Sequence, residues 1–215
     1  MIILDIETTG LTNDCGICEI GAININDISK PFLQDCRIDE DDLITLGAMR
    51  VNGRNLEILK DKNKQTQKQL IENYLDWVSI QENKLFYGQN VTWDISMIQA
   101  KSMKYDLHKK FLEIHIQRGM DLHTLAQERY FEIYKKYFLK ETGQSAFNLG
   151  EILKFCGIPD ERINVKGNEI IKEGKYHTAL EDCVLEGEAV YRLKFGKNLF
   201  KEFKKFSIPD YLNRE

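Results

Sequence analysis

The sequence predicts an α/β domain with a central mixed β-sheet flanked by helices. Short stretches rich in β-branched residues come first, and helical periodicities then alternate with further strand-like stretches, an order that favours a mixed sheet. The chain has 215 residues, enough for a sizeable core, and contains no internal repeat and no Gly-, Ser- or Pro-rich linker. We therefore expect a single domain over residues 1–215.

Three strands are expected at the start of the chain. Residues 2–8 and 17–26 have the composition of strands, and Asn26-Asp27 is a turn signal that leads into a third strand around residues 30–36. Because short turns join these stretches, we expect neighbouring antiparallel strands.

The rest of the chain predicts four helices and two shorter strands. Apolar residues at helical spacing mark the helices, and Asn148 and Gly157 are start and stop signals for the third of them. Residues 37–65 receive no assignment, and residues 127–147 are interpreted as a helical insertion or a partner site. The expected ranges are a helix at 66–78, a strand at 84–87, a helix from about 92, a strand at 111–116, and helices at 148–157 and 179–193.

The last helix is expected to bury one face and to expose the other. Its polar residues Glu181, Glu188 and Arg192 are expected to face water, whereas Asp182 lies at the edge of the apolar stripe. The residues expected in the stripe are Leu180, Val184, Gly187 and Tyr191.

Composition argues against several classes of protein. The net charge of −4 provides no global basic field, and no apolar run approaches the roughly 18 residues that a membrane span needs. The start of the chain lacks the features of a signal peptide, so we expect a cytoplasmic protein without a membrane partner. Five cysteines in a chain of this length do not predict a disulfide framework. Cys15 and Cys18 form a lone CxxC, which cannot complete a four-ligand zinc site.

Two acids interrupt the first predicted strand. Side chains alternate along a strand, so Asp5 and Glu7 project from the same face, about 6–7 Å apart. Two neighbouring carboxylates repel each other unless a cation lies between them. Gly10 follows shortly after and permits a tight turn with exposed backbone amides. This arrangement predicts a cation site at the end of the strand.

Two further acids occupy similar positions. Asp94 lies in the first turn of a helix that leaves a strand, and Asp182 lies about one turn into the last helix. His177 precedes that helix. Glu181, the neighbour of Asp182, belongs to the polar stripe and is rejected as a site residue.

Three stretches that follow one another in this order resemble the motifs of the DEDDh 3′–5′ exonucleases. They are IILDIETTGL with CEIGAI, then GQNVTWD, then HTALED. Similarity continues in DLHTLA at residues 121–126 and in NLGEILKFCGI at residues 148–158. The family includes the proofreading epsilon subunit of bacterial DNA polymerase III. The resemblance implies a ribonuclease H-like exonuclease fold.

The resemblance also implies a metal site and a general base. Asp5, Glu7, Asp94 and Asp182 would hold two Mg²⁺ or Mn²⁺ ions, with Asp5 bridging both ions and Asp94 acting partly through water. Such ions activate water and stabilise both oxygens of an in-line displacement at phosphorus, and they prefer oxygen ligands. His177 would take the proton from the attacking water, since a pKa of about 6.5 suits a base at neutral pH.

Four positions are implied to bind the end of the substrate. Thr8 and the backbone around it would bond the terminal 3′-hydroxyl, Leu11 would wedge between terminal bases, and Trp93 would stack on a base or sugar. Asn90 matches the Asn of the second motif, although Gln89 replaces the His that usually precedes it. Basic residues around the third motif would contact phosphates. They are Arg162, Lys166, Lys172, Lys175, Lys194, Lys197, Lys201, Lys204 and Lys205.

The resemblance therefore predicts a metal-dependent 3′–5′ exonuclease that releases nucleoside monophosphates from single-stranded 3′ ends, with DNA favoured. A DNA polymerase or another replication or repair protein is a candidate partner. Two alternatives stay open within the motifs: an exoribonuclease that trims RNA or short oligonucleotides, and a non-catalytic module that retains the fold. A structural divalent-ion protein is a third, but it would need neither His177 nor a basic rim.

Overall fold

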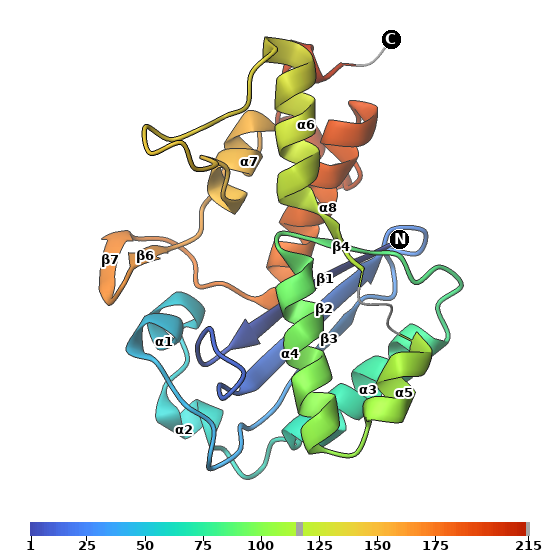
Figure 1. The fold of residues 1–215 in the computed structure, drawn as a ribbon, viewed down its shortest axis with the longest axis vertical. Coiled ribbons are helices and arrows are strands. Elements are labelled where there is room, and N and C mark those ends of the chain that lie inside the picture. The colour runs from blue at the N-terminus through green and yellow to red at the C-terminus, as the bar shows by residue number, and fades with distance from the viewer. Residues whose placement is uncertain (115–117, 214–215) are drawn as a thin grey trace.

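A central mixed sheet organises the chain, as the sequence predicts (Figure 1). The computed structural model describes residues 1–114 and 118–213. Its strands are β1 (Ile2–Thr8), β2 (Ile17–Asn24), β3 (Phe32–Asp35), β4 (Phe86–Gly88) and β5 (Met120–Asp121). The strand order is β3-β2-β1-β4-β5. The first three strands are antiparallel, as expected, whereas β4 runs parallel to both β1 and β5.

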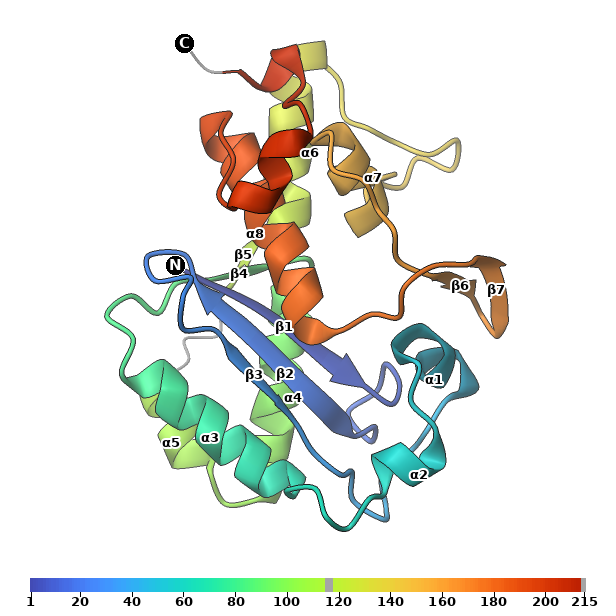
Figure 2. The ribbon, with the colours of Figure 1, turned by 180° about the vertical axis from the view of Figure 1, so that it is seen from behind.

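Helices cover both faces of this sheet (Figure 2). The helices are α1 (Leu46–Asn52), α2 (Leu56–Leu59), α3 (Gln67–Ser79), α4 (Val91–Lys104), α5 (His108–Ile114), α6 (Leu122–Tyr134), α7 (Leu149–Phe155) and α8 (Ala179–Phe195). Ile2, Leu4 and Ile6 of β1 pack with residues of α3, α4 and α5, whereas Ile3 packs with residues of α6, α7 and α8. Because side chains alternate along a strand, Asp5 and Glu7 project from the same face as Ile3, which is the face that α8 covers.

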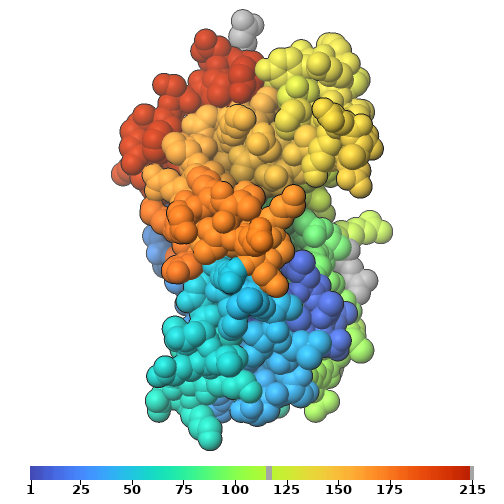
Figure 3. Space-filling model, turned by 90° about the vertical axis from the view of Figure 1, so that its left-hand side faces the viewer, coloured from blue at the N-terminus to red at the C-terminus, as the bar shows by residue number. Residues whose placement is uncertain are grey.

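A small hairpin stands apart from the main sheet. It pairs β6 (Asn164–Lys166) with β7 (Glu169–Lys172), and 3₁₀ turns at Lys201–Lys205 and Asp210–Leu212 follow α8. Figure 3 shows the orange segment that contains the hairpin against the cyan segment that contains α1, in agreement with the contacts between β6 and α1. Within the described residues, no helix is both long and apolar enough to cross a membrane.

One predicted strand is wrong. Residues 111–116 were expected as a strand, but residues 108–114 form α5, and residues 115–116 lie outside the described part of the chain. Phe111 and Ile114, three residues apart, are both buried, which is helical spacing. A short apolar run cannot be assigned to strand or helix by its periodicity. The actual edge strand, β5, has only 2 residues.

The exposed face predicted for α8 is also wrong at two positions. Glu188 and Arg192 are both fully buried, and Nε of Arg192 donates to Oε1 of Glu188 over 2.8 Å. The other oxygen of Glu188 accepts the backbone N–H groups of Leu199 and Phe200. The segment that follows α8 returns along the helix and covers this face. The two residues that were expected to face water therefore form a buried ion pair.

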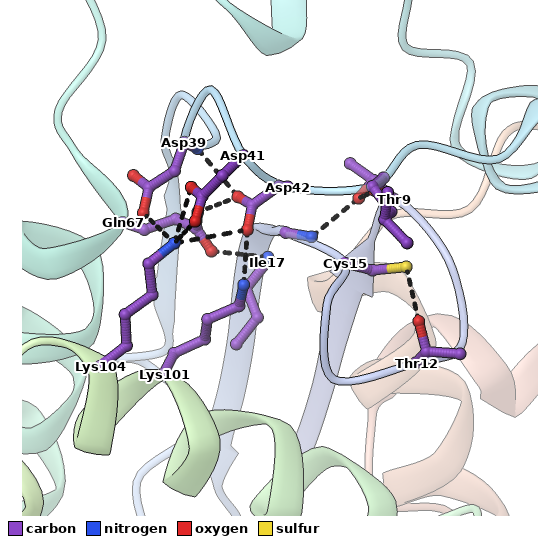
Figure 4. A network of polar contacts seen from close by, with 12 residues as sticks. Thr9, Thr12, Cys15, Ile17, Asp39, Asp41, Asp42, Gln67, Lys101 and Lys104 are labelled. Carbon is purple, nitrogen blue, oxygen red and sulfur yellow. Dashed lines mark hydrogen bonds and ion pairs between the residues drawn. The ribbon is translucent and has the colours of Figure 1, made fainter.

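The unassigned residues 37–65 are held against α4 by a buried ion pair (Figure 4). Nζ of Lys101 lies 2.6 Å from Oδ1 of Asp42, and both side chains are almost fully buried. The other carboxylate oxygen accepts a hydrogen bond from Gln67, whose own oxygen accepts the N–H of Ile17 over 2.8 Å. Thr45 N–H donates to the carbonyl of Thr9, so this network also supports the turn that follows β1.

Breaking this ion pair is expected to destabilise the fold. Lys101→Met leaves the buried Asp42 carboxylate without its cation, which costs about 3–5 kcal/mol. Lys104→Met is the matched control, because Lys104 contacts the same acidic cluster but its side chain is 34% exposed, and we expect a loss below about 1 kcal/mol. Urea unfolding measures both variants. Equal losses would contradict a dominant role for the buried pair.

Candidate active site

The N-terminal end of α8 lies directly on the sheet beside β1. Gly21 of β2 permits this approach, since a Cβ atom there would lie 2.5 Å from the carbonyl carbon of Ala179. Oε1 of Glu19 accepts the N–H of Ala179 over 2.8 Å and so caps the first turn of the helix. Thr178 is the N-cap. These contacts bring Asp182, in the first turn, to the strand that carries Asp5 and Glu7.

The second motif reaches the same place from the other side. Asn90 adopts a left-handed conformation (φ 58°) between β4 and α4, and its N–H donates to Oδ1 of Asp121. Asp94, in the first turn of α4, is 4% exposed, and its Oδ1 accepts the N–H of Ile6 over 3.2 Å. The structure therefore brings Asp5, Glu7 and Asp94 together at one end of β1.

The charges of these acids are not balanced by the protein. Burial, followed by the charges of Asp182 and Asp94, raises the pKa of Asp5 well above its ordinary value. Burial raises the pKa of Asp94 in the same direction. Burial and the charge of Asp182 raise the pKa of Glu7 to about 7, although His177 and Arg54 oppose the shift. Among the described residues, no ion pair within 4 Å joins Asp5, Glu7 or Asp94 to a basic side chain.

His177 contacts the acidic group through Asp182. Its Nδ1 lies 3.2 Å from Oδ2 of Asp182, and its Nε2 lies 3.1 Å from the carbonyl oxygen of Ile163. The backbone N–H of His177 donates to the carbonyl of Val51 at the end of α1. Burial lowers the pKa of the imidazole, but the hydrogen bond and charge of Asp182 outweigh it, so the pKa is raised above 6.5.

Arg162 has a different position from the one expected. It was assigned to a basic rim, yet it is 7% exposed and its Nη1 lies 3.0 Å from each carboxylate oxygen of Asp182. Its Nε and Nη2 donate to Asp160. Arg162 and His177 are thus the two basic side chains that contact Asp182. A short sequence motif gives no signal for such a contact, which spans twenty residues and depends on the loop before β6.

A fifth carboxylate lies in the same group and was not predicted. Glu186 is 1% exposed and follows Asp182 by one turn of α8, so both project from the same side of the helix. Its charge raises the pKa of Asp5, and the charges of Asp182 and Asp94 raise its own pKa in addition to burial. The spacing of four residues from Asp182 was the available sequence signal.

The residues expected to bind the terminus of the substrate lie around the end of β1, and they differ in solvent exposure. Leu11 is 81% exposed on the turn after β1, and Asn90 is exposed at the start of α4. Trp93 is partly buried against the core that contains α3 and α4. Thr8 is buried, and its hydroxyl donates to the carbonyl of Gly10 over 2.7 Å.

A family comparison identifies the class of protein. The family model of exonucleases called RNase_T matches residues 2–145, about two thirds of the chain. The chain belongs to this exonuclease family. The match includes Asp5, Glu7 and Asp94 and ends before His177 and Asp182.

Solved structures share the fold at low sequence identity. Exonuclease I of E. coli in complex with a dT13 oligonucleotide has a TM-score of 0.64 and 16% identity, over 89% of this chain and 40% of that one. Exonuclease I of Methylocaldum szegediense has a TM-score of 0.61 and 15% identity, over 95% and 42% of the two chains. Cell-death related nuclease 4 has a TM-score of 0.61 and 17% identity, over 89% and 62%.

These likenesses establish the ribonuclease H-like exonuclease fold of Exonuclease I. The chain spans about 40% of the length of the first of these Exonuclease I structures. A sequence search of curated proteins found no match.

The donor set fits divalent cations, on which members of an exonuclease family depend. Oxygen atoms of buried carboxylates are the ligands that hard divalent ions prefer. Ligand atoms of Glu7, His177 and Asp182 all lie within 4.8 Å of one another. A second acidic group, Asp39, Asp41 and Asp42, is equally close, but each of its members forms an ion pair with Lys101 or Lys104. Among the described residues, Asp5, Glu7 and Asp94 form no such ion pair, so the group at the end of β1 is the candidate metal centre.

Without metal, the stability of the protein is expected to fall as pH rises through the titration of Glu7. Its folded-state pKa of about 7 exceeds the ordinary 4.5, so its stabilising contribution is full below pH 4.5 and is lost as pH rises through 7. The difference amounts to at most about 3 kcal/mol. Urea unfolding in EDTA at about pH 5 and pH 7.5 measures it. Glu7→Gln should flatten the dependence, and an unchanged slope in that variant would assign it to other groups.

Proposed function

We propose that this chain is a metal-dependent 3′–5′ exonuclease that hydrolyses phosphodiester bonds at single-stranded 3′ ends, preferentially of DNA, and releases nucleoside monophosphates. The observation that supports this best is the group of Asp5, Glu7 and Asp94, which form no ion pair with a basic side chain among the described residues, beside Asp182 and His177. The dT13 oligonucleotide in the E. coli structure supports single-stranded DNA as the substrate class. In this proposal residues 1–215 act as one exonuclease domain, with residues 127–147 as an insertion.

Four acids hold the metal in this proposal. Asp5, Glu7, Asp94 and Asp182 would hold two Mg²⁺ or Mn²⁺ ions, and Asp5 would serve as a ligand of both. When bound, such ions activate the attacking water and stabilise both oxygens of an in-line displacement at phosphorus. The carboxylates are fixed before the metal binds, because the backbone of Ile6 holds Asp94 and the cap of α8 positions Asp182.

His177 receives the proton of the attacking water. Asp182 orients the imidazole ring through Nδ1. The proton acceptor is therefore Nε2, which gives up its contact with the carbonyl oxygen of Ile163 for a contact with the attacking water. Asp182 also stabilises the imidazolium that results, so the ring can accept a proton in a partly buried position. Asp182 thus links the metal centre and the base.

The terminal nucleotide lies against the turn after β1 and the start of α4. Leu11, which is exposed, contacts the terminal base, and Trp93 stacks on a base or sugar. The backbone around Thr8 bonds the 3′-hydroxyl, since the hydroxyl of Thr8 itself already donates to Gly10. Asn90 offers an exposed amide at the same place. A site built for one free terminus predicts exonucleolytic attack.

Labelled oligonucleotides test this function and its polarity. Single-stranded DNA labelled at its 5′ end should give a descending ladder with Mg²⁺ or Mn²⁺ and no products with EDTA, and a 3′-phosphate should slow the reaction sharply. Cleavage of closed circular DNA would overturn the polarity. RNA degraded faster than DNA would make the chain an exoribonuclease, and no cleavage of either would favour the non-catalytic module. Co-purification with a polymerase tests the partner expected from the resemblance.

A further inference from the structure

Two buried glutamates of α8 have opposite surroundings. Glu188 is fully buried, and its oxygens are bonded by Arg192 and by the N–H groups of Leu199 and Phe200. Glu186, half a turn earlier, is 1% exposed, and its Oε1 accepts the N–H of Gln89 over 3.0 Å. Its Oε2 is buried and has no hydrogen-bond partner in the described part of the chain. The hydrogen bonds of the fold account for the burial of the Glu188 carboxylate, whereas they do not account for the burial of the Glu186 carboxylate.

The free oxygen of Glu186 lies beside Gly88 of β4. A Cβ atom on Gly88 would lie 3.2 Å from this oxygen and 2.7 Å from the carbonyl oxygen of Leu4, the residue before Asp5. The absence of a side chain at Gly88 therefore lets β4, β1 and α8 approach closely here. Burial raises the pKa of Asp5, and the charges of Asp182, Asp94 and Glu186 add to the shift in that order. No basic side chain forms an ion pair with Glu186 within the described residues.

We propose that Glu186 is a fifth carboxylate of the divalent-ion site and supplies its free oxygen to the ion on the Asp5 and Asp94 side. The inference rests on the proposed function, which requires the metal centre. A buried carboxylate oxygen needs a cation or a hydrogen-bond donor, and no donor bonds this oxygen among the described residues. A divalent ion shared with Asp5 satisfies this oxygen and neutralises both charges.

Mn²⁺ binding to the purified full chain tests the proposal without relying on activity. Mn²⁺ titrations monitored by calorimetry and by electron paramagnetic resonance should show two bound ions in the wild type. Glu186→Gln, which keeps the shape of the side chain, should weaken at least one of them about 10-fold or more. Glu186→Asp keeps the charge but retracts the oxygen by one methylene, and a coordinating role predicts a similar loss. Glu181→Gln, on the same helix but outside the group, should bind as the wild type does.

The outcomes separate this inference from the function on which it rests. Asp5→Asn should lose Mn²⁺ binding if the metal centre is as proposed. If Asp5→Asn loses binding while Glu186→Gln keeps the wild-type affinity within about 2-fold, Glu186 is not a ligand and the exonuclease proposal stands. Wild-type affinity in Glu186→Asp alone would show a charge effect and also overturn coordination. If the wild type binds no Mn²⁺, both proposals fail. Thermal unfolding in EDTA verifies that each variant is folded.

Discussion

Asp5→Asn is expected to reduce turnover by at least about 10³-fold, or about 4 kcal/mol of transition-state stabilisation, because in the proposed site it removes a carboxylate that would serve both metal ions. The same variant should be more stable than the wild type in EDTA, since the pKa of Asp5 is raised well above its ordinary value by burial and neighbouring acids. Added Mn²⁺ should then stabilise the wild type and not the variant.

Asp5 is a better position for this experiment than Asp182. Removing the charge of Asp182 would also leave Arg162 buried without one of its two partners, which destabilises the fold independently of metal. Asp41→Asn is the control, because Asp41 is exposed and belongs to the second acidic group. Turnover of Asp5→Asn close to the wild type, with Asp41→Asn inactive, would move the metal centre to that group.

His177→Ala is expected to lower turnover 10²–10⁴-fold, approximately the usual contribution of general-base catalysis, while Mn²⁺ affinity stays close to that of the wild type. Asp182 keeps its bonds from Arg162 in this variant, so the carboxylate stays in place. Turnover against pH and Mn²⁺ titration measure the two effects separately.

The pH dependence of wild-type turnover should report the titration of His177. The base acts when it is deprotonated, and Asp182 raises the pKa of His177, so activity should rise with pH through a value above 6.5. His123→Ala is the matched control, since the ring of His123 bonds Ser145 and does not contact the acids. Near-wild-type turnover of His177→Ala at saturating Mg²⁺ would exclude His177 as the base.

Local sequence patterns were sufficient for the fold class, and they indicated the acids of the three motifs as the candidate metal site. The strands β1, β2 and β3 carry their composition and turn signals within a few residues, and Thr66 and Asn148 cap α3 and α7 through side-chain hydrogen bonds. Alternation along β1 was enough to place Asp5 and Glu7 on one face. Each of these inferences depends on neighbours in the chain.

The errors occurred where partners distant in sequence decide the environment. Arg192 reads as an exposed position on α8 until the segment after Phe200 covers it and supplies carbonyl acceptors. Arg162 reads as part of a basic rim until the loop before β6 directs it to Asp182. Glu186 reads as a polar residue of a helix, and only the approach of Gly88 and Gln89 shows that it is enclosed.

The most direct test of the metal centre is anomalous diffraction at the manganese edge from crystals grown with Mn²⁺ and a nucleoside monophosphate. The account predicts two anomalous peaks about 3.5–4 Å apart beside Asp5, bonded by oxygens of Glu7, Asp94 and Asp182 and next to the phosphate. A map with no peak at the end of β1, or with its only peak at Asp39, Asp41 and Asp42, would contradict it.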